Sequence, residues 1–63
     1  MSNLFKVSLF KDSFLNSKLV ESRNVFASSD DDSRVKGERF FMLKFKDFSR
    51  SPDKFKVEVE RLQ

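Results

Sequence analysis

The chain has 63 residues, with 13 Lys or Arg against 10 Asp or Glu, so its formal net charge is +3. It contains no Cys and no His, which excludes disulfides and removes the thiol nucleophile, the commonest general base and the usual zinc ligands. Its single Gly leaves no glycine-rich loop for phosphate. We therefore expect one small domain over residues 1–63 that is not an enzyme and holds no cofactor or metal ion.

Hydropathy along the chain argues against a membrane protein. The longest uninterrupted apolar run is the four residues 40–43, whereas a membrane-spanning helix needs about 20. Lys6 and Lys11 interrupt the N-terminal segment, so it lacks the apolar core of a signal peptide. The absence of Cys fits a reducing compartment. The expectation is a soluble cytoplasmic protein with no membrane partner.

The first predicted element is a strand over residues 4–11. Phe5, Val7 and Leu9 alternate there with polar side chains, as in a strand with one buried face.

Residues 12–27 allow two interpretations. As a helix over residues 13–26, Leu15, Leu19 and Phe26 would share one face. The many Ser, Asn and Val residues are indifferent helix formers and favour a strand that begins at Lys18. Both interpretations stay open, with the strand preferred.

An acidic loop is expected at about residues 28–34, because Asp30, Asp31 and Asp32 follow two serines. The preferred interpretation is a solvated loop with no binding function. The spacing lacks the alternating ligands and central Gly of an EF-hand, so a metal site is not expected. A docking patch for a basic partner is the weaker functional alternative.

Two further strands are predicted, over residues 39–48 and 54–62. Phe41, Leu43 and Phe45 form the more apolar face of the first. The second alternates strictly between apolar and charged residues, and Pro52 in the connection favours a turn. These strands would form a C-terminal antiparallel hairpin. The predicted fold is mainly β, a small antiparallel sheet of three to four strands; the alternative is α+β, with one helix at about 13–26 packed on a three-stranded antiparallel sheet.

The register of that hairpin decides how basic its second face is. In the preferred register Lys46 faces Lys54 and Lys44 faces Lys56, which would gather four ammonium groups. A slip of two residues brings Glu58 opposite Lys44 and partly neutralises the cluster.

The same face carries Phe40 and Met42, so it would be apolar at one end and basic at the other. A partner is expected to lie on it. The candidate partner-binding residues are Phe40, Met42, Lys44, Lys46, Lys54, Lys56, Phe48, Arg50 and Lys6.

Two functions fit this surface. The preferred one is a small binding protein that occupies the surface of a protein partner, as an inhibitor, adaptor or subunit, by analogy with phage- or plasmid-encoded factors that act on host machinery. The alternative is single-stranded nucleic-acid or RNA binding, with Lys on phosphates and Phe40 or Phe48 stacked on bases. Missing Tyr and Trp and the mild charge weigh slightly against it. A homodimer is compatible with either at this chain length.

Overall fold

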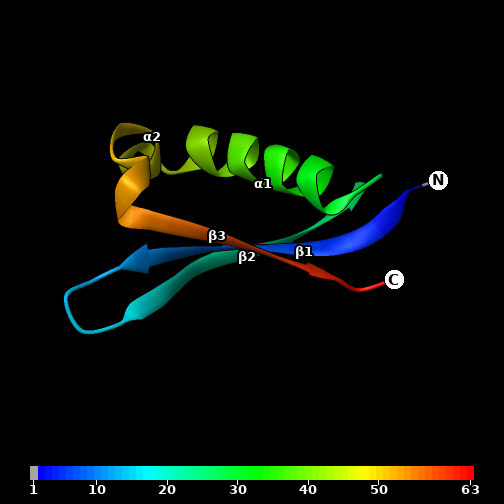
Figure 1. Ribbon diagram of the computed structural model, residues 1–63. Coiled ribbons are helices and arrows are strands. Elements are labelled where there is room, and N and C mark those ends of the chain that lie inside the picture. Colours follow the sequence, from blue (N-terminus) through cyan, green and yellow to red (C-terminus); the bar gives the residue numbers. More distant parts are fainter. Residues whose placement is uncertain (1) are drawn as a thin grey trace.

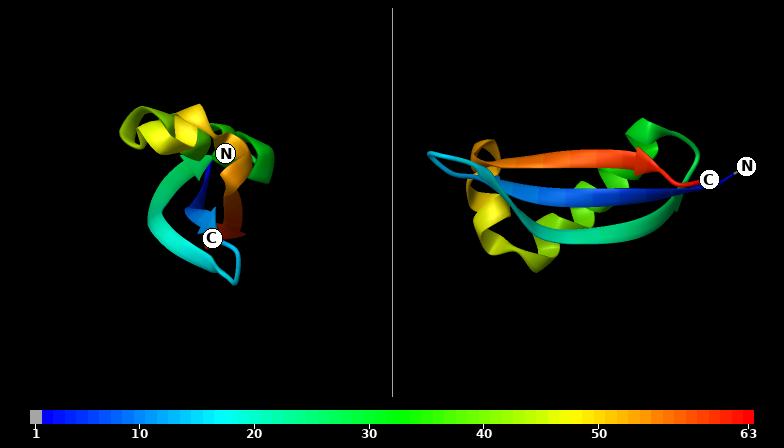
Figure 2. Two further views of the ribbon diagram at one scale, coloured as in Figure 1. Left: turned by 90° about the vertical axis from the view of Figure 1, so that its left-hand side faces the viewer. Right: turned by 90° about the horizontal axis from the view of Figure 1, so that it is seen from below.

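A three-stranded antiparallel sheet with one long helix on one face forms the fold, in a computed structural model that describes residues 2–63 (Figure 1). The strand order is β2-β1-β3, so the N-terminal strand lies in the centre. Figure 2 shows the sheet curving beneath the helical layer. The elements are β1 (Asn3–Asp12), β2 (Ser17–Ala27), α1 (Asp30–Lys44), the short helix α2 (Lys46–Arg50), a single 3-10 turn (Pro52–Lys54) and β3 (Phe55–Arg61).

The three strands correspond to the predicted ones at 4–11, at 54–62 and from residue 18 onward. In the centre of the sheet Val7 lies opposite Arg23 on one side and Val59 on the other. The register between β1 and β2 shifts at Leu9/Phe10, which leaves Val20 as the extra residue of a bulge. The alternation of apolar and polar residues in these segments therefore predicted strands correctly.

The predicted strand over 39–48 is wrong, and with it the C-terminal hairpin. Residues 30–44 form α1, and β3 pairs with β1 instead. The alternation of Lys with Phe imitated a strand, while the residues that α1 buries are Ser33, Gly37 and Phe41, two of which carry no hydrophobic signal. The α+β alternative describes the class that is observed, a helix on a three-stranded antiparallel sheet. Its helix at 13–26 is misplaced, because that segment forms the turn after β1 and most of β2.

The predicted acidic loop at 28–34 is also wrong, since its aspartates form the first turn of α1. The hydroxyl of Ser29 accepts a hydrogen bond from the backbone N–H of Asp32 at 3.1 Å, and the Asp32 carboxylate accepts one from the backbone N–H of Ser28 at 3.0 Å. This is a variant of the capping box, and the three carboxylates also favour the positive end of the helix dipole. The acidic run therefore starts a helix.

The core lies between α1 and the helix-facing side of the sheet. Val7, Leu9, Phe41 and Phe48 are buried together. Gly37 allows the close approach of α1, because a Cβ built on it would lie 2.4 Å from Cγ1 of Val7. At Gly37, where α1 has no side chain, the helix backbone therefore packs directly on Val7 of the central strand.

Within residues 2–63 no helix is long and apolar enough to cross a membrane.

Candidate binding surface at the hairpin end

The β1–β2 hairpin ends in two large apolar side chains that touch almost nothing. Phe14 is 100% exposed and Leu15 is 85% exposed. The hairpin extends past the helical layer at the end of the molecule where α2 lies (Figure 1). Hairpin turns usually carry Gly, Asn, Asp or Ser at such positions. The tip therefore presents apolar surface in a place where folding gains nothing from it.

Hydrogen bonds at its base hold this tip in one conformation. The backbone N–H of Ser13 donates to the carbonyl of Asn16 at 2.8 Å, and the backbone N–H of Asn16 donates to the Ser13 hydroxyl at 3.3 Å. One step further back, the Ser17 hydroxyl donates to the Asp12 carboxylate at 2.7 Å. Phe14 and Leu15 are thus presented from an ordered turn, which lowers the entropy that a binding partner must remove.

A groove beside the hairpin carries most of the basic side chains of this end. It consists of two adjoining depressions of about 300 and 180 Å³ that share Lys11, Asp47 and Phe55. We call it the basic groove; its lining residues are Lys11, Val20, Lys44, Phe45, Lys46, Asp47, Arg50, Ser51, Lys54 and Phe55. Five of these are cationic and Asp47 is the one carboxylate among them.

Within the described chain, intramolecular ion pairs neutralise little of this positive charge. Lys44 forms a salt bridge with Glu21 of β2, with 2.6 Å between Nζ and Oε1. Among residues 2–63 the other salt bridges are Lys36–Asp32 and Lys56–Glu58, which lie outside the groove. The four remaining groove cations, Lys11, Lys46, Arg50 and Lys54, therefore form no ion pair within 4.0 Å in the described part of the chain.

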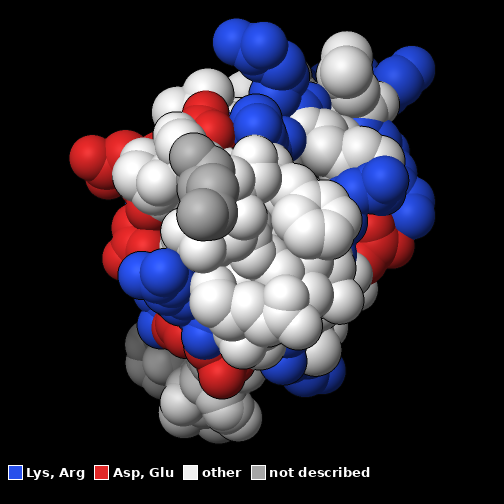
Figure 3. Space-filling view, turned by 90° about the vertical axis from the view of Figure 1, so that its right-hand side faces the viewer, with Lys and Arg blue, Asp and Glu red and all other residues white. Residues whose placement is uncertain are grey.

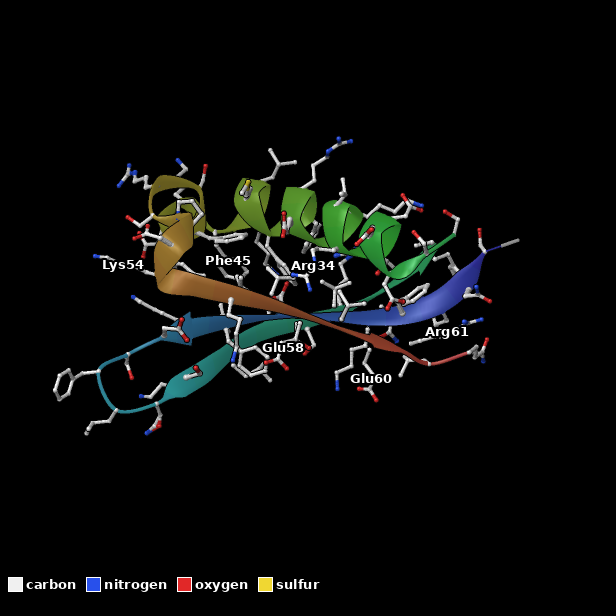
Figure 4. The ribbon with its side chains drawn as sticks, viewed as in Figure 1. Arg34, Phe45, Lys54, Glu58, Glu60 and Arg61 are labelled. Atoms are coloured by element: carbon white, nitrogen blue, oxygen red, sulfur yellow. The ribbon has the colours of Figure 1, made fainter. Side chains whose placement is uncertain are left out.

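Phenylalanine rings form the wall of the basic groove. Phe55 packs on the buried Phe48 with 5.3 Å between ring centroids, and the Lys11 ammonium lies 5.8 Å from the Phe55 centroid. Lys44 lies 5.6 Å from the centroid of Phe45, the residue between α1 and α2. Phe45 and Lys54 both lie at the α2 end in Figure 4. The groove thus joins cations to half-buried aromatic surface.

Some of the expected partner-binding residues meet in this groove. Lys44, Lys46, Arg50 and Lys54 all line it, although they come from helices and not from a hairpin.

The other expected residues lie elsewhere, and the expected shared face of Phe40 and Met42 does not exist. These two residues lie about 200° apart around α1. Phe40 packs against the core, with the guanidinium of Arg23 3.7 Å from its ring centroid, while Met42 is at the surface. Phe48 is 3% exposed and belongs to the core, so its ring is not available for stacking.

Lys6 and Lys56 lie on the side of the sheet that no helix covers. Lys6 is opposite Glu60 in the register of β1 and β3, and Lys56 pairs with Glu58 at 3.2 Å. Figure 4 shows Glu58 and Glu60 directed away from the helical layer. This open face therefore mixes both charge signs, and the basic character is confined to the groove.

At the opposite end, where the chain termini lie, the surface is different in character. Figure 3 shows uncharged side chains in the middle of this view, with Lys, Arg, Asp and Glu around them. Phe26 of β2, Val35 of α1 and Leu62 after β3 are exposed apolar residues.

The pKa of the Asp32 carboxyl in the first turn of α1 is lowered, chiefly because the backbone N–H of Ser28 donates to it and then because Lys36 lies beside it.

Sequence reasoning missed four residues that define the hairpin end of the molecule, namely Lys11, Phe14, Leu15 and Phe55. The signal for the tip was an apolar pair set between the turn-forming residues Asp12–Ser13 and Asn16–Ser17. Four of the five groove cations were expected from the sequence, whereas Lys11 and Phe55 join them only because β1 and β3 lie side by side in the folded chain.

Comparison with known proteins gives no relative for this chain. No protein-family model, curated protein or solved structure matches it. In residues 2–63 no cluster of three or more acidic residues has the arrangement to hold a metal ion.

Proposed function

We propose that this protein is a small, non-enzymatic binding protein that acts in the cytoplasm by occupying the surface of a protein partner, as an inhibitor, adaptor or subunit. The observation that carries the proposal is the hairpin tip, where Phe14 and Leu15 are presented to solvent by an ordered turn. The homodimer suggested by the short chain stays a prediction.

The energetic argument is that these side chains gain free energy only when another molecule covers them. Full burial of a Phe or Leu side chain is worth about 1.5–3 kcal/mol. Interfaces commonly depend on a few apolar anchors of this kind, surrounded by polar residues. Phe14 and Leu15 together would supply several kcal/mol of binding free energy, and Asp12, Ser13 and Asn16 would form the polar surroundings.

Nucleic-acid binding is the second candidate, and the basic groove is the observation that favours it. Lys11, Lys46, Arg50 and Lys54 could each contact a phosphate beside the Phe55 ring. The ring is half-buried against Phe48, however, so a base could reach only part of its face. The tip supports a protein partner more directly.

The test is affinity capture with purified, tagged protein as bait, after the lysate has been treated with nuclease. We expect the wild-type protein to retain a defined partner and the double variant Phe14→Ser/Leu15→Ser to lose it. Leu43→Ser is the matched control, since Leu43 is 82% exposed on the outer side of α1. Far-UV circular dichroism would show whether all three proteins are folded. Equal capture by wild type and tip variant, or capture that occurs only in a parallel lysate without nuclease, would overturn the proposal.

A further inference from the structure

We propose that the basic groove binds a carboxylate-rich segment of the same protein partner whose apolar site receives Phe14 and Leu15. This inference rests on the proposed function and adds to it the chemistry of the partner: an apolar site bordered by Asp and Glu side chains. It is carried by the position of the groove, the charge inside it and the single carboxylate that it contains.

The groove and the tip lie near each other at the same end of the molecule. Lys11 lines both depressions of the groove and lies in β1 three residues before Phe14. At about 3.3 Å per residue, the apolar tip begins roughly 10 Å from the groove. A partner surface of ordinary interface size spans that distance easily. A protein that covers the tip therefore also faces the groove.

The charge in the groove favours an anion. Lys11, Lys46, Arg50 and Lys54 are exposed, and their backbones are held close together on β1, α2 and the 3-10 turn. They form no ion pair within 4.0 Å among residues 2–63, and Asp47 is the one carboxylate of the lining. An acidic segment lying between them would relieve the mutual repulsion of these cations and would speed association by electrostatic steering.

Asp47 favours a peptide over a nucleic acid as that anion. It lines both depressions, so a ligand that follows the groove must pass it. A nucleic acid carries a negative charge on every nucleotide and would place a phosphate near this carboxylate. A peptide can place a neutral residue there and donate a backbone N–H to Asp47, with Glu or Asp side chains on Lys46 and Lys54.

The experiment compares two labelled probes by fluorescence anisotropy at low ionic strength. One is a peptide in which pairs of Glu alternate with Leu, and the other is an oligothymidylate of the same total charge. The groove variant is Lys46→Glu/Lys54→Glu, and the control is Lys6→Glu/Arg39→Glu, which makes the same change in net charge on the open face and on the outer side of α1. The neutral variant Lys46→Gln/Lys54→Gln serves if the reversed charges prevent folding.

We expect the wild type to bind the peptide, with affinity that decreases as salt is added. The groove variant should bind it at least tenfold more weakly, and the control within about twofold of wild type. Binding of the oligothymidylate in preference to the peptide would overturn the inference in favour of nucleic acid. No binding of the peptide by wild type, or equal losses in both variants, would also overturn it.

Failure of this inference can be told apart from failure of the proposed function. In the affinity capture, the tip variant tests the proposed function and the groove variant tests the inference. Suppose the groove variant captures the partner as well as wild type does, while the tip variant fails. That result would refute binding of an acidic segment in the groove and would still support a protein partner.

Discussion

Replacing Gly37 by Ala tests the close approach between α1 and the central strand. In an exposed helix this change would stabilise by about 1 kcal/mol, because Gly is the poorer helix former. Here the new Cβ would lie 2.4 Å from Cγ1 and 2.8 Å from Cβ of Val7, which is fully buried. No rotation of the Val7 side chain removes the contact with its Cβ. Gly37 has no positive φ, so the effect comes from space and not from backbone conformation.

The magnitude follows from these opposing terms. Overpacking a close-packed core costs about 1–3 kcal/mol, and a contact this short belongs at the upper limit. After subtraction of the helix-propensity gain, we expect Gly37→Ala to lower the free energy of unfolding by about 2 kcal/mol. For a domain of this size, that loss lowers the melting temperature by about 8–16 °C.

The assay is thermal unfolding followed by far-UV circular dichroism, since the chain has no Trp or Tyr for fluorescence. Val35→Ala, at an exposed position of the same helix, is the control and should leave the melting temperature unchanged or slightly higher. The double variant Val7→Ala/Gly37→Ala should be more stable than the sum of the single changes implies, because two of the three short contacts are removed. A Gly37→Ala protein that melts at or above the wild-type temperature would refute the reasoning.

Three further predictions concern the helix start and the sheet edge. Ser29→Ala removes the N-cap of α1 and should cost about 1 kcal/mol, seen as a melting temperature lower by about 4–8 °C; an unchanged value would mean that water replaces the cap fully. The lowered pKa of Asp32 means that its charged form stabilises the fold above its ordinary pKa of 3.8 and that this contribution is lost as the pH falls through the lower folded value. The melting-temperature gap between wild type and Asp32→Asn should therefore be constant above about pH 5 and close as the pH falls further, and a gap independent of pH would contradict the assignment. Arg34 donates to the backbone carbonyl of Val57 at 2.9 Å on the free edge of β3 (Figure 4), so Arg34→Ala should increase self-association in light scattering at high concentration, whereas equal scattering would show that the edge is protected in another way.

Alternation of apolar and polar residues was enough to predict β1 and β3, and composition favoured a strand at β2 without excluding a helix. The alternation around Val7 and around Val57 has a period of two, and only a strand places such residues on one face. The same logic failed over residues 39–48, where Phe41 and Phe45 also fit a helical spacing of four. The decisive helix signal was the cap at Ser29 with Asp32 three residues later, which resembled a loop because it is acidic and polar.

The position of α1 on the sheet and the full set of residues at the candidate site depend on contacts between segments that are distant in the sequence. The buried side of α1 contains Gly37, which adds no apolar side chain to the hydrophobic pattern. Its role is to leave space for Val7. Lys11 and Lys54 are far apart in sequence and line one groove only because β3 returns antiparallel beside β1. Sequence patterns report the local period of a chain, whereas a binding surface depends on which distant segments the fold places together.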